Sequence, residues 1–313
     1  MDVKHIGLWA MACLSGAAAG GGCAGPSGTV RIGYGRTLVV YDPRIDRVVY
    51  FGRGGPNALH VTADVYRPPT PGRYVFRGCA YTWIAPQSRW LKADGSRTKW
   101  PPEPLMDTGP AAVRRQTKTD LLLMGPCTWR NTRERKRFTV DTDESVGLDI
   151  ALLPVGGREP DGELSIWSTT AVPPGAILAV PKGKTRAAKD ALAAAWRAAA
   201  TDDGPWQLVD TGKIAQAGKV FIDGPPVVAA WWKGQWFVRV GSDGPAARRS
   251  PENAVLEIYV ARDAGIIELE MIAPLRPVDA AGGNRWSETW RIIPAKAPTV
   301  ADLADALARS RGR

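Results

Sequence analysis

The feature that most restricts the fold of this chain is a series of short apolar runs separated by turn residues. The runs cover residues 37–41, 47–51, 121–124, 138–140, 148–153, 164–172, 176–180, 227–232, 236–240, 256–260, 266–271 and 289–293. Turn residues such as Asp42-Pro43-Arg44 and Lys233-Gly234-Gln235 stand between neighbouring runs. Many short β-rich runs with turns between them predict an all-β sandwich or barrel.

Two segments depart from the β pattern. Residues 185–200 are rich in alanine, and Leu192 and Trp196 lie four positions apart, which predicts one inserted helix. Residues 299–310 predict a second, peripheral helix. Large β-sandwiches commonly reach this length as one unit. We therefore expect one β domain over residues 29–295, followed by a C-terminal helix and tail over residues 296–313.

The first residues have the layout of a secretory signal. Lys4 supplies a positive charge, residues 6–19 are apolar, and small residues lead to Cys23. The apolar run is too short to span a membrane, so we expect a signal peptide over residues 1–22. Cys23 after three glycines resembles a bacterial lipoprotein cleavage site, and both a lipid anchor at Cys23 and plain secretion remain open. Either form predicts an exported protein of the periplasm or outer envelope.

Cysteine and histidine are scarce in the remaining chain. If Cys23 is lipidated, Cys79 and Cys127 remain; export permits a disulfide between them, and two separate buried thiols are the alternative. His60 is the only histidine after the predicted signal. Histidine-based zinc sites and Ser-His-Asp triads need more than a lone imidazole, so we expect no metal and no cofactor.

The formal net charge is +10, which favours acidic partners. The densest basic run holds Arg130, Arg133, Arg135, Lys136 and Arg137. We interpret it as a solvated hairpin tip, because no recognised nucleic-acid module accompanies it. The charge therefore favours an anionic polymer over nucleic acid as a partner.

The segment from residue 77 to residue 110 combines aromatic, polar and proline residues. It contains Trp83, Trp90 and Trp100, together with Gln87 and Asp107. An aromatic platform beside hydrogen-bonding side chains has the composition of a sugar site. The alternative is a proline-braced loop whose tryptophans close one end of a sandwich.

The run over residues 266–271 carries two glutamates. Strand alternation places Glu268 and Glu270 on one face, with the apolar side chains of the run on the other. Their backbone positions are then about 6.6 Å apart. Acid/base work on a sugar needs carboxylates at roughly this scale. The alternative is the solvated face of an amphipathic strand.

In their order along the chain, these segments resemble a bacterial domain family of unknown function in the galactose mutarotase-like superfamily. The resemblance rests on residues 39–57, 83–87, 100–110, 167–175, 268–275 and 288–292. It implies a galactose mutarotase-like β-supersandwich whose concave face binds a mono- or polysaccharide. Trp83, Trp90 and Trp100 would stack on or wall the ligand, and the polar residues Gln87, Asp107, Glu268 and Glu270 would bind its hydroxyl groups.

The resemblance leaves the chemistry open between three classes. Mutarotases use a histidine acid and a glutamate base; Glu270 fits the base, but no histidine stands in the acid's place unless His60 reaches it. This departure argues against epimerase activity and favours carbohydrate binding. The enzyme alternative is an epimerase-like isomerase, polysaccharide lyase or hydrolase with Glu270 as base and Tyr81 as acid. A structural envelope protein with a vestigial site is the third class.

Overall fold

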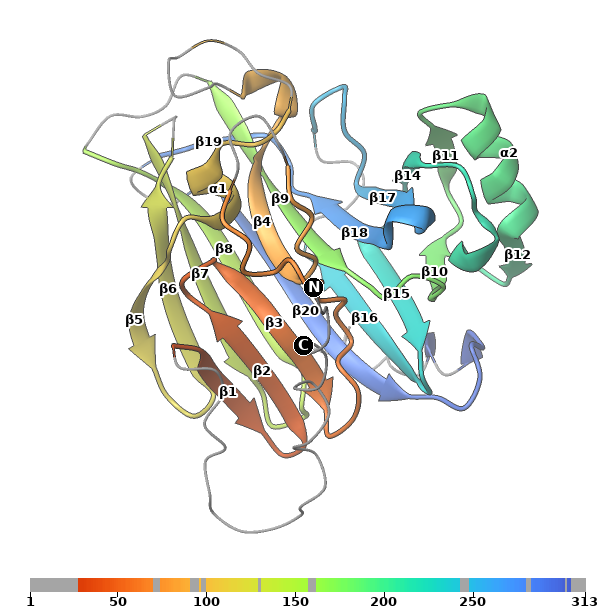
Figure 1. The fold of residues 1–313 in the computed structure, drawn as a ribbon, viewed down its shortest axis with the longest axis horizontal. Helices are drawn as coiled ribbons and strands as arrows, with labels where there is room; N and C mark the ends of the chain where they lie inside the picture. Colours follow the sequence, from red (N-terminus) through yellow and green to blue (C-terminus); the bar gives the residue numbers. More distant parts are fainter. Residues whose placement is uncertain are drawn as a thin grey trace, which may run out of the picture.

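The structure, a computed structural model, describes residues 28–69, 74–90, 96, 100–128, 131–156, 162–242, 248–279, 283–301 and 303–304. Two ten-stranded sheets pack face to face (Figure 1), which confirms the prediction of an all-β sandwich. The predicted signal peptide, Cys23 and most of the predicted C-terminal helix lie outside the described residues. No helix in the described ranges is both long enough and apolar enough to cross a membrane.

The first sheet, called sheet A here, is antiparallel throughout its named pairs. Its order is β1 (Val30–Tyr34), β2 (Thr37–Asp42), β3 (Arg47–Arg53), β4 (Ala80–Ala85), β9 (Glu163–Ala171), β18 (Ile266–Ile272), β17 (Leu256–Ala261), β14 (Gly218–Asp223) and β11 (Lys184–Ala187), and β19 (Arg276–Pro277) pairs with β9.

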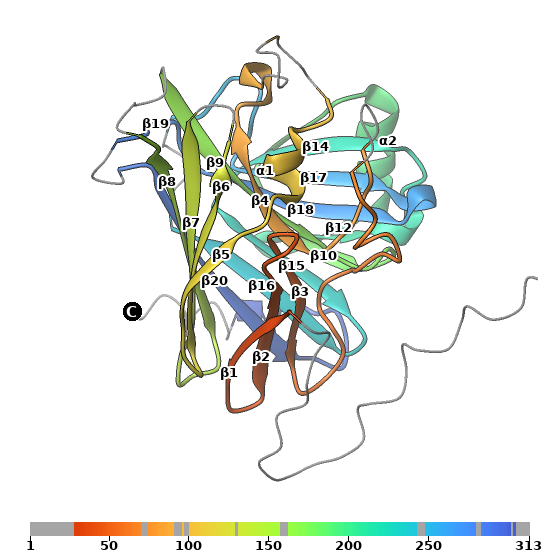
Figure 2. The same ribbon diagram turned by 60° about the vertical axis from the view of Figure 1, so that its left-hand side comes forward.

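The second sheet, called sheet B, lies against sheet A (Figure 2). Its order is β12 (Ala200–Asp203), β13 (Trp206–Asp210), β10 (Ile177–Pro181), β15 (Val227–Trp232), β16 (Gln235–Gly241), β20 (Arg285–Pro294), β8 (Val146–Pro154), β7 (Thr132–Val140), β6 (Asp120–Cys127) and β5 (Ala112–Gln116). The helices are α1 (Pro104–Thr108) and α2 (Asp190–Ala199), with 3-10 turns at Gln87–Arg89, Thr211–Lys213 and Arg262–Ala264.

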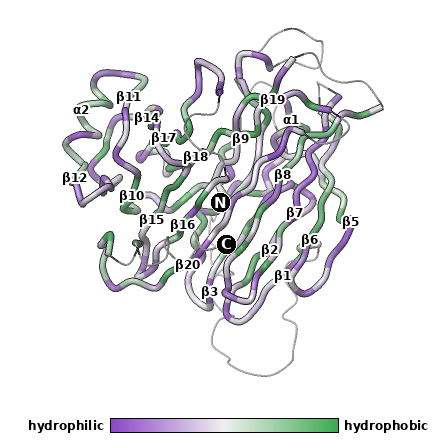
Figure 3. Tube along the Cα trace, turned by 180° about the vertical axis from the view of Figure 1, so that it is seen from behind, coloured by the Kyte–Doolittle hydropathy of each residue, from purple (hydrophilic) through white to green (hydrophobic). Residues whose placement is uncertain are grey.

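Strand alternation divides the side chains between the interior and the outer faces of the sandwich. On β18, Ile267, Leu269 and Met271 are fully buried in the core between the sheets. Figure 3 shows hydrophobic stretches on the strands of both sheets, and on β6 Leu121 and Leu123 are also fully buried. Residues with period two therefore form the core, as elementary strand geometry requires.

Two sequence predictions are wrong in detail. Residues 185–200 do not form one helix, because the first of them belong to β11 and α2 begins only at Asp190. The basic run is no hairpin tip: its described residues lie on β7, where Glu134 and Lys136 are buried and Arg137 is exposed. The cysteines Cys79 and Cys127 are not joined in a disulfide.

A buried arginine joins the two sheets. The side chain of Arg239, on β16 of sheet B, is fully excluded from solvent. Its Nη1 donates to the carbonyl of Leu269 on β18 at 2.7 Å and to the Thr170 hydroxyl on β9 at 2.8 Å. Its Nη2 donates to the Ser168 carbonyl at 3.2 Å. The guanidinium thus satisfies carbonyl groups of sheet A from a strand of sheet B.

The charge of Arg239 is balanced inside sheet B. Glu288 on β20 accepts hydrogen bonds from Arg239 Nη2 at 2.8 Å and Nε at 3.0 Å. The indole nitrogens of Trp286 and Trp290 also donate to its two oxygens, each at 2.7 Å. Breaking a buried ion pair with this many hydrogen bonds destabilises the folded protein strongly, because either partner alone would be an uncompensated buried charge.

We expect Glu288→Ala to lower the free energy of unfolding by about 3–5 kcal/mol, because it leaves Arg239 charged and unpaired. Urea unfolding followed by tryptophan fluorescence measures the change. The matched control is Asp202→Ala, which breaks an ion pair of 3.0 Å with Lys182 in which the Asp202 side chain is 63% exposed. That variant should cost much less stability than Glu288→Ala, because exposed ion pairs contribute little. Equal losses in the two variants would contradict the assigned role.

Candidate ligand-binding site

The outer face of sheet A, which points away from sheet B, carries a row of polar side chains. Tyr81 on β4 lies opposite Thr169 on β9, Thr169 opposite Glu270 on β18, and Glu270 opposite Glu257 on β17. These side chains face outward because their neighbours along each strand, such as Leu269, point into the core. Antiparallel register therefore brings residues from distant parts of the chain into one line.

Four ionisable side chains form the centre of this face. Lys219 on β14 places Nζ 2.6 Å from Glu270 Oε2 and 2.7 Å from Glu257 Oε2. Glu268 lies two residues before Glu270 on β18, and its Oε1 accepts a hydrogen bond from the Tyr81 hydroxyl. Glu268 is 8% exposed and Glu270 is 2% exposed. The two glutamates therefore lie on one face, and that face is buried rather than solvated.

Several polar atoms on the outer face have no protein partner. Glu270 Oε2 also accepts from the Trp167 indole at 2.9 Å, but Oε1 of Glu270 and Oε2 of Glu268 accept no hydrogen bond from any described residue. The indole nitrogen of Trp83 and the hydroxyl of Thr169 are buried and likewise lack a partner within the described ranges. Buried polar groups are normally satisfied, so these atoms are candidate contacts for a ligand.

Burial governs the ionisation of the acidic pair. It raises the pKa of Glu270 to about 8, against the opposing effect of the Lys219 ammonium. Burial also raises the pKa of Glu268, and it raises the pKa of Tyr81 well above its ordinary value. Burial alone would lower the pKa of Lys219, but Glu270 and Glu257 raise it overall. Near neutral pH, most Glu270 side chains are therefore protonated, which leaves few of them available as a general base.

Aromatic rings cover one end of the acidic cluster. The Trp83 ring contacts those of Trp90, Trp100 and Trp167, with centroid separations of 5.7, 5.8 and 5.3 Å. Trp90 is fully buried, and its indole nitrogen donates to the Ile84 carbonyl at 2.7 Å. Trp83 is 3% exposed, whereas Trp100 is 49% exposed. Trp83 and Trp90 thus form the base of the cluster, and Trp100 is the ring of this cluster that is about half exposed.

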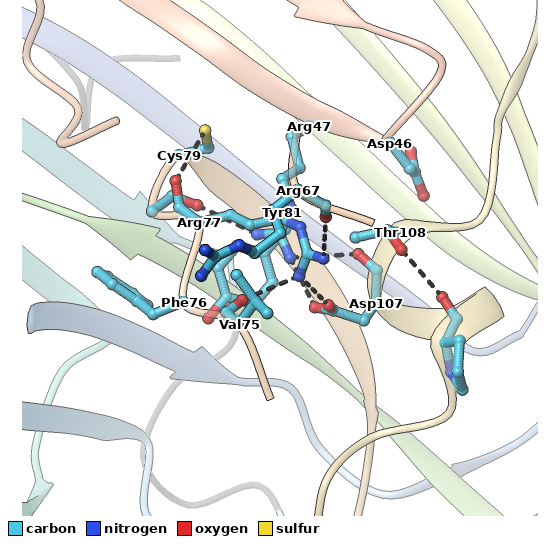
Figure 4. Close-up of polar contacts among 12 residues, drawn as sticks. Asp46, Arg47, Arg67, Val75, Phe76, Arg77, Cys79, Tyr81, Asp107 and Thr108 are labelled. Carbon is cyan, nitrogen blue, oxygen red and sulfur yellow. Dashed lines mark hydrogen bonds and ion pairs between the residues drawn. The ribbon is translucent and has the colours of Figure 1, made fainter. Parts of the chain in front are cut away.

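Asp107 connects helix α1 to the acidic pair through arginine (Figure 4). Its Oδ1 lies 2.6 Å from Arg47 Nη2, and its Oδ2 lies 3.0 Å from Arg77 Nη1. The Arg47 guanidinium is 4.0 Å from the centre of the Tyr81 ring. Both Asp107 oxygens are engaged by arginines, so this carboxylate positions Arg47 beside Tyr81. Asp107, Trp83 and Glu270 therefore lie on the same side of sheet A.

The remaining predicted residues are Gln87 and His60. Gln87 begins the 3-10 turn Gln87–Arg89 and is half-buried. The His60 ring stacks on Phe76 at 6.3 Å, burial lowers its pKa, and no described contact joins it to either glutamate of β18. No group of three or more acidic, histidine or cysteine side chains in the described part of the chain could hold a metal ion.

Sequence reasoning missed Lys219, Glu257 and Trp167. Glu257 stands in the same alternating pattern as Glu268 and Glu270, between Leu256 and Ile258. This alternation could have indicated Glu257 as a site residue. Lys219 carries no such signal, because only the sheet order brings β14 beside β17.

Residues 53–293 match the family model described as Domain of unknown function (DUF4380). The chain belongs to this family. A search of curated proteins finds no match.

Solved structures identify the fold. A galactose mutarotase-like protein from Lactobacillus casei shares 7% identity with the chain, covering 85% of this chain and 100% of that chain with a TM-score of 0.60. A GalM/aldose epimerase homologue from C. elegans shares 10% identity, covering 86% and 100% with a TM-score of 0.52. These matches confirm the galactose mutarotase-like β-supersandwich fold, and the family model confirms the predicted membership of a domain family of unknown function.

We expect Glu270→Gln to flatten the pH dependence of stability. Because burial raises the pKa of Glu270 from 4.5 to about 8, the folded state binds its proton more tightly than the unfolded chain between those values. Between these two pKa values, the Glu270 carboxyl therefore lowers the free energy of unfolding as the pH rises, by at most about 1.4 kcal/mol per pH unit. Glutamine does not titrate, so the melting temperature of the variant should fall less than that of the wild type.

Calorimetric melting between pH 5 and pH 8 measures the difference. Asp149→Asn is the control, because Asp149 is exposed on β8 of the opposite sheet. It should leave the slope unchanged. A Glu270→Gln slope equal to the wild-type slope would show that this carboxyl group does not hold its proton in the folded state.

Proposed function

We propose that the outer face of sheet A binds carbohydrate. The observation that carries the proposal is the pair Glu268 and Glu270, buried on this face with one unpartnered oxygen each. Burial of carboxylates outside the main core costs stability, and such perturbed groups concentrate at functional sites. The fold supports the proposal, since structures of galactose mutarotase-like proteins share it.

The described side chains offer the two kinds of contact that a sugar needs. Trp100, 49% exposed, provides an aromatic surface for the apolar face of a ring. Glu268 and Glu270 accept hydrogen bonds from hydroxyl groups, and the Trp83 indole nitrogen donates one. We propose Gln87, in the 3-10 turn that follows β4, as a further hydrogen-bonding group. Asp107 acts indirectly, through the arginine that it holds beside Tyr81.

The ionisation of the site favours binding over catalysis. An isomerase or lyase that uses Glu270 as base needs the ionised carboxylate at its working pH. Burial stabilises the protonated form of Glu270, which cannot accept a proton from a substrate. We therefore propose binding without turnover, and we expect no unsaturated, ultraviolet-absorbing product from uronate polymers.

Trp100→Ala should weaken sugar binding at least about tenfold, a loss of about 1.4 kcal/mol, because it removes the exposed stacking surface. A glycan array identifies the ligands, and titration calorimetry measures the dissociation constants. Tyr34→Ala is the matched control: Tyr34 is 41% exposed on β1, outside the acidic row. Absence of binding to every mono- and oligosaccharide on the array would favour a structural envelope role.

We also propose that the protein is exported and that the mature chain begins at or after Cys23. The support is the charged, apolar and small-residue layout of residues 1–22. Mass spectrometry of the protein purified from cell envelopes should find either a diacylated Cys23 or an unmodified shortened N-terminus. An intact chain that starts at Met1 would refute export.

A further inference from the structure

The charges in the row around Glu268 and Glu270, on the outer face of sheet A, do not balance. The carboxylates are Glu257, Glu268, Glu270 and Asp107, and the cations are Lys219, Arg47 and Arg77. Arg47 and Arg77 both pair with Asp107, and Lys219 pairs with Glu257 and Glu270, so no cation of the described ranges forms an ion pair with Glu268. With every group ionised, four negative charges face three positive ones.

The excess negative charge lies between Glu268 and Glu270. Glu257 is well satisfied, since Oε2 binds Lys219 and Oε1 accepts from the Asn253 side chain and the Ala254 amide, both at 3.0 Å. Glu268 receives only the neutral Tyr81 hydroxyl. The unpartnered oxygens, Oε2 of Glu268 and Oε1 of Glu270, are therefore the atoms at which a positive charge would be most stabilised.

We propose that this site recognises a sugar that bears a primary amine, bound as the ammonium ion by Glu268 Oε2 and Glu270 Oε1. The inference rests on the proposed carbohydrate-binding function and names its ligand class. An ammonium group has three N–H donors and no acceptor, so two of these donors can bind the two carboxylates. The third has an acceptor in the unpartnered hydroxyl of Thr169, which lies opposite Glu270 in the sheet register.

The charge balance also decides against an acidic ligand at this face. A uronate would bring a carboxylate toward Glu268 and Glu270, and like charges in a buried site repel strongly. The proton held by Glu270 at neutral pH marks the same imbalance. When the ammonium binds, Glu270 releases its proton to solvent. The ammonium supplies one positive charge in place of that proton, so the net charge of the occupied site equals that of the empty site.

Titration calorimetry at neutral pH tests the inference with four ligands on one ring scaffold: glucosamine, glucose, N-acetylglucosamine and glucuronate. We expect glucosamine to bind at least about tenfold more tightly than glucose or N-acetylglucosamine, and glucuronate to bind most weakly. The same comparison with galactosamine and galactose covers the other common ring configuration.

Glu268→Gln removes the charge but keeps an acceptor for the Tyr81 hydroxyl. It should reduce the preference for glucosamine over glucose to within about twofold, corresponding to loss of most of the charge-assisted hydrogen bond. Asp149→Asn, an equal change of charge on the exposed face of β8, should leave the preference intact. Melting curves establish that both variants are folded.

The outcomes separate the two proposals. If glucose and N-acetylglucosamine bind as tightly as glucosamine, the amine specificity is wrong while carbohydrate binding stands. If glucosamine is preferred but Glu268→Gln keeps the preference, the assigned carboxylates are wrong. If no sugar binds, the proposed function falls and the ligand class falls with it.

Discussion

The ion pair of Arg239 with Glu288 fixes the inner face of the strands that carry the candidate site. Arg239 donates to carbonyl oxygens of Ser168 on β9 and Leu269 on β18. The next residues along those strands, Thr169 and Glu270, point to the opposite face of the sheet. A slip of one residue in either strand would turn its outward side chains into the core and break these contacts. The same polar contact thus joins the sheets and sets which residues face the ligand.

The central part of the outer face of sheet A is buried almost as completely as the core between the sheets. The segment that contains Arg77 and helix α1 covers its upper strands, and Asp107 ties the two segments together by accepting from Arg77 and Arg47. Arg47 then lies over the Tyr81 ring, and Tyr81 donates to Glu268. This chain of contacts explains how carboxylates on the outside of a sandwich come to be less than a tenth exposed. Their low exposure, rather than their number, is what distinguishes them from an ordinary solvated strand face.

Local pattern was enough to find most strands and to pair Glu268 with Glu270. The run over residues 227–232 coincides with β15, because a continuous apolar run that ends at a glycine turn defines it. The prolines and tryptophans around β4 concealed a strand, and the charges of β7 concealed an alternation that buries Glu134 and Lys136 between the sheets. The contact of Lys219 with Glu270 spans 51 positions, and no local pattern encodes it. Long-range register, which depends on sheet order, set the limit of sequence reasoning here.

The tryptophans illustrate why composition overstates an aromatic platform. Trp83 and Trp90 pack against each other and against Trp167, so most of their surface contributes to folding rather than to recognition. With Trp100 as the exposed ring, discrimination between ligands depends mainly on polar and charged groups. The formal charge of +10 describes the field that an approaching molecule meets at a distance. Inside the buried row, the nearest groups dominate, because effective dielectric screening is weak there and two carboxylates have free oxygens. A basic protein can therefore have an acidic site, and the local charge balance is the better guide to what binds.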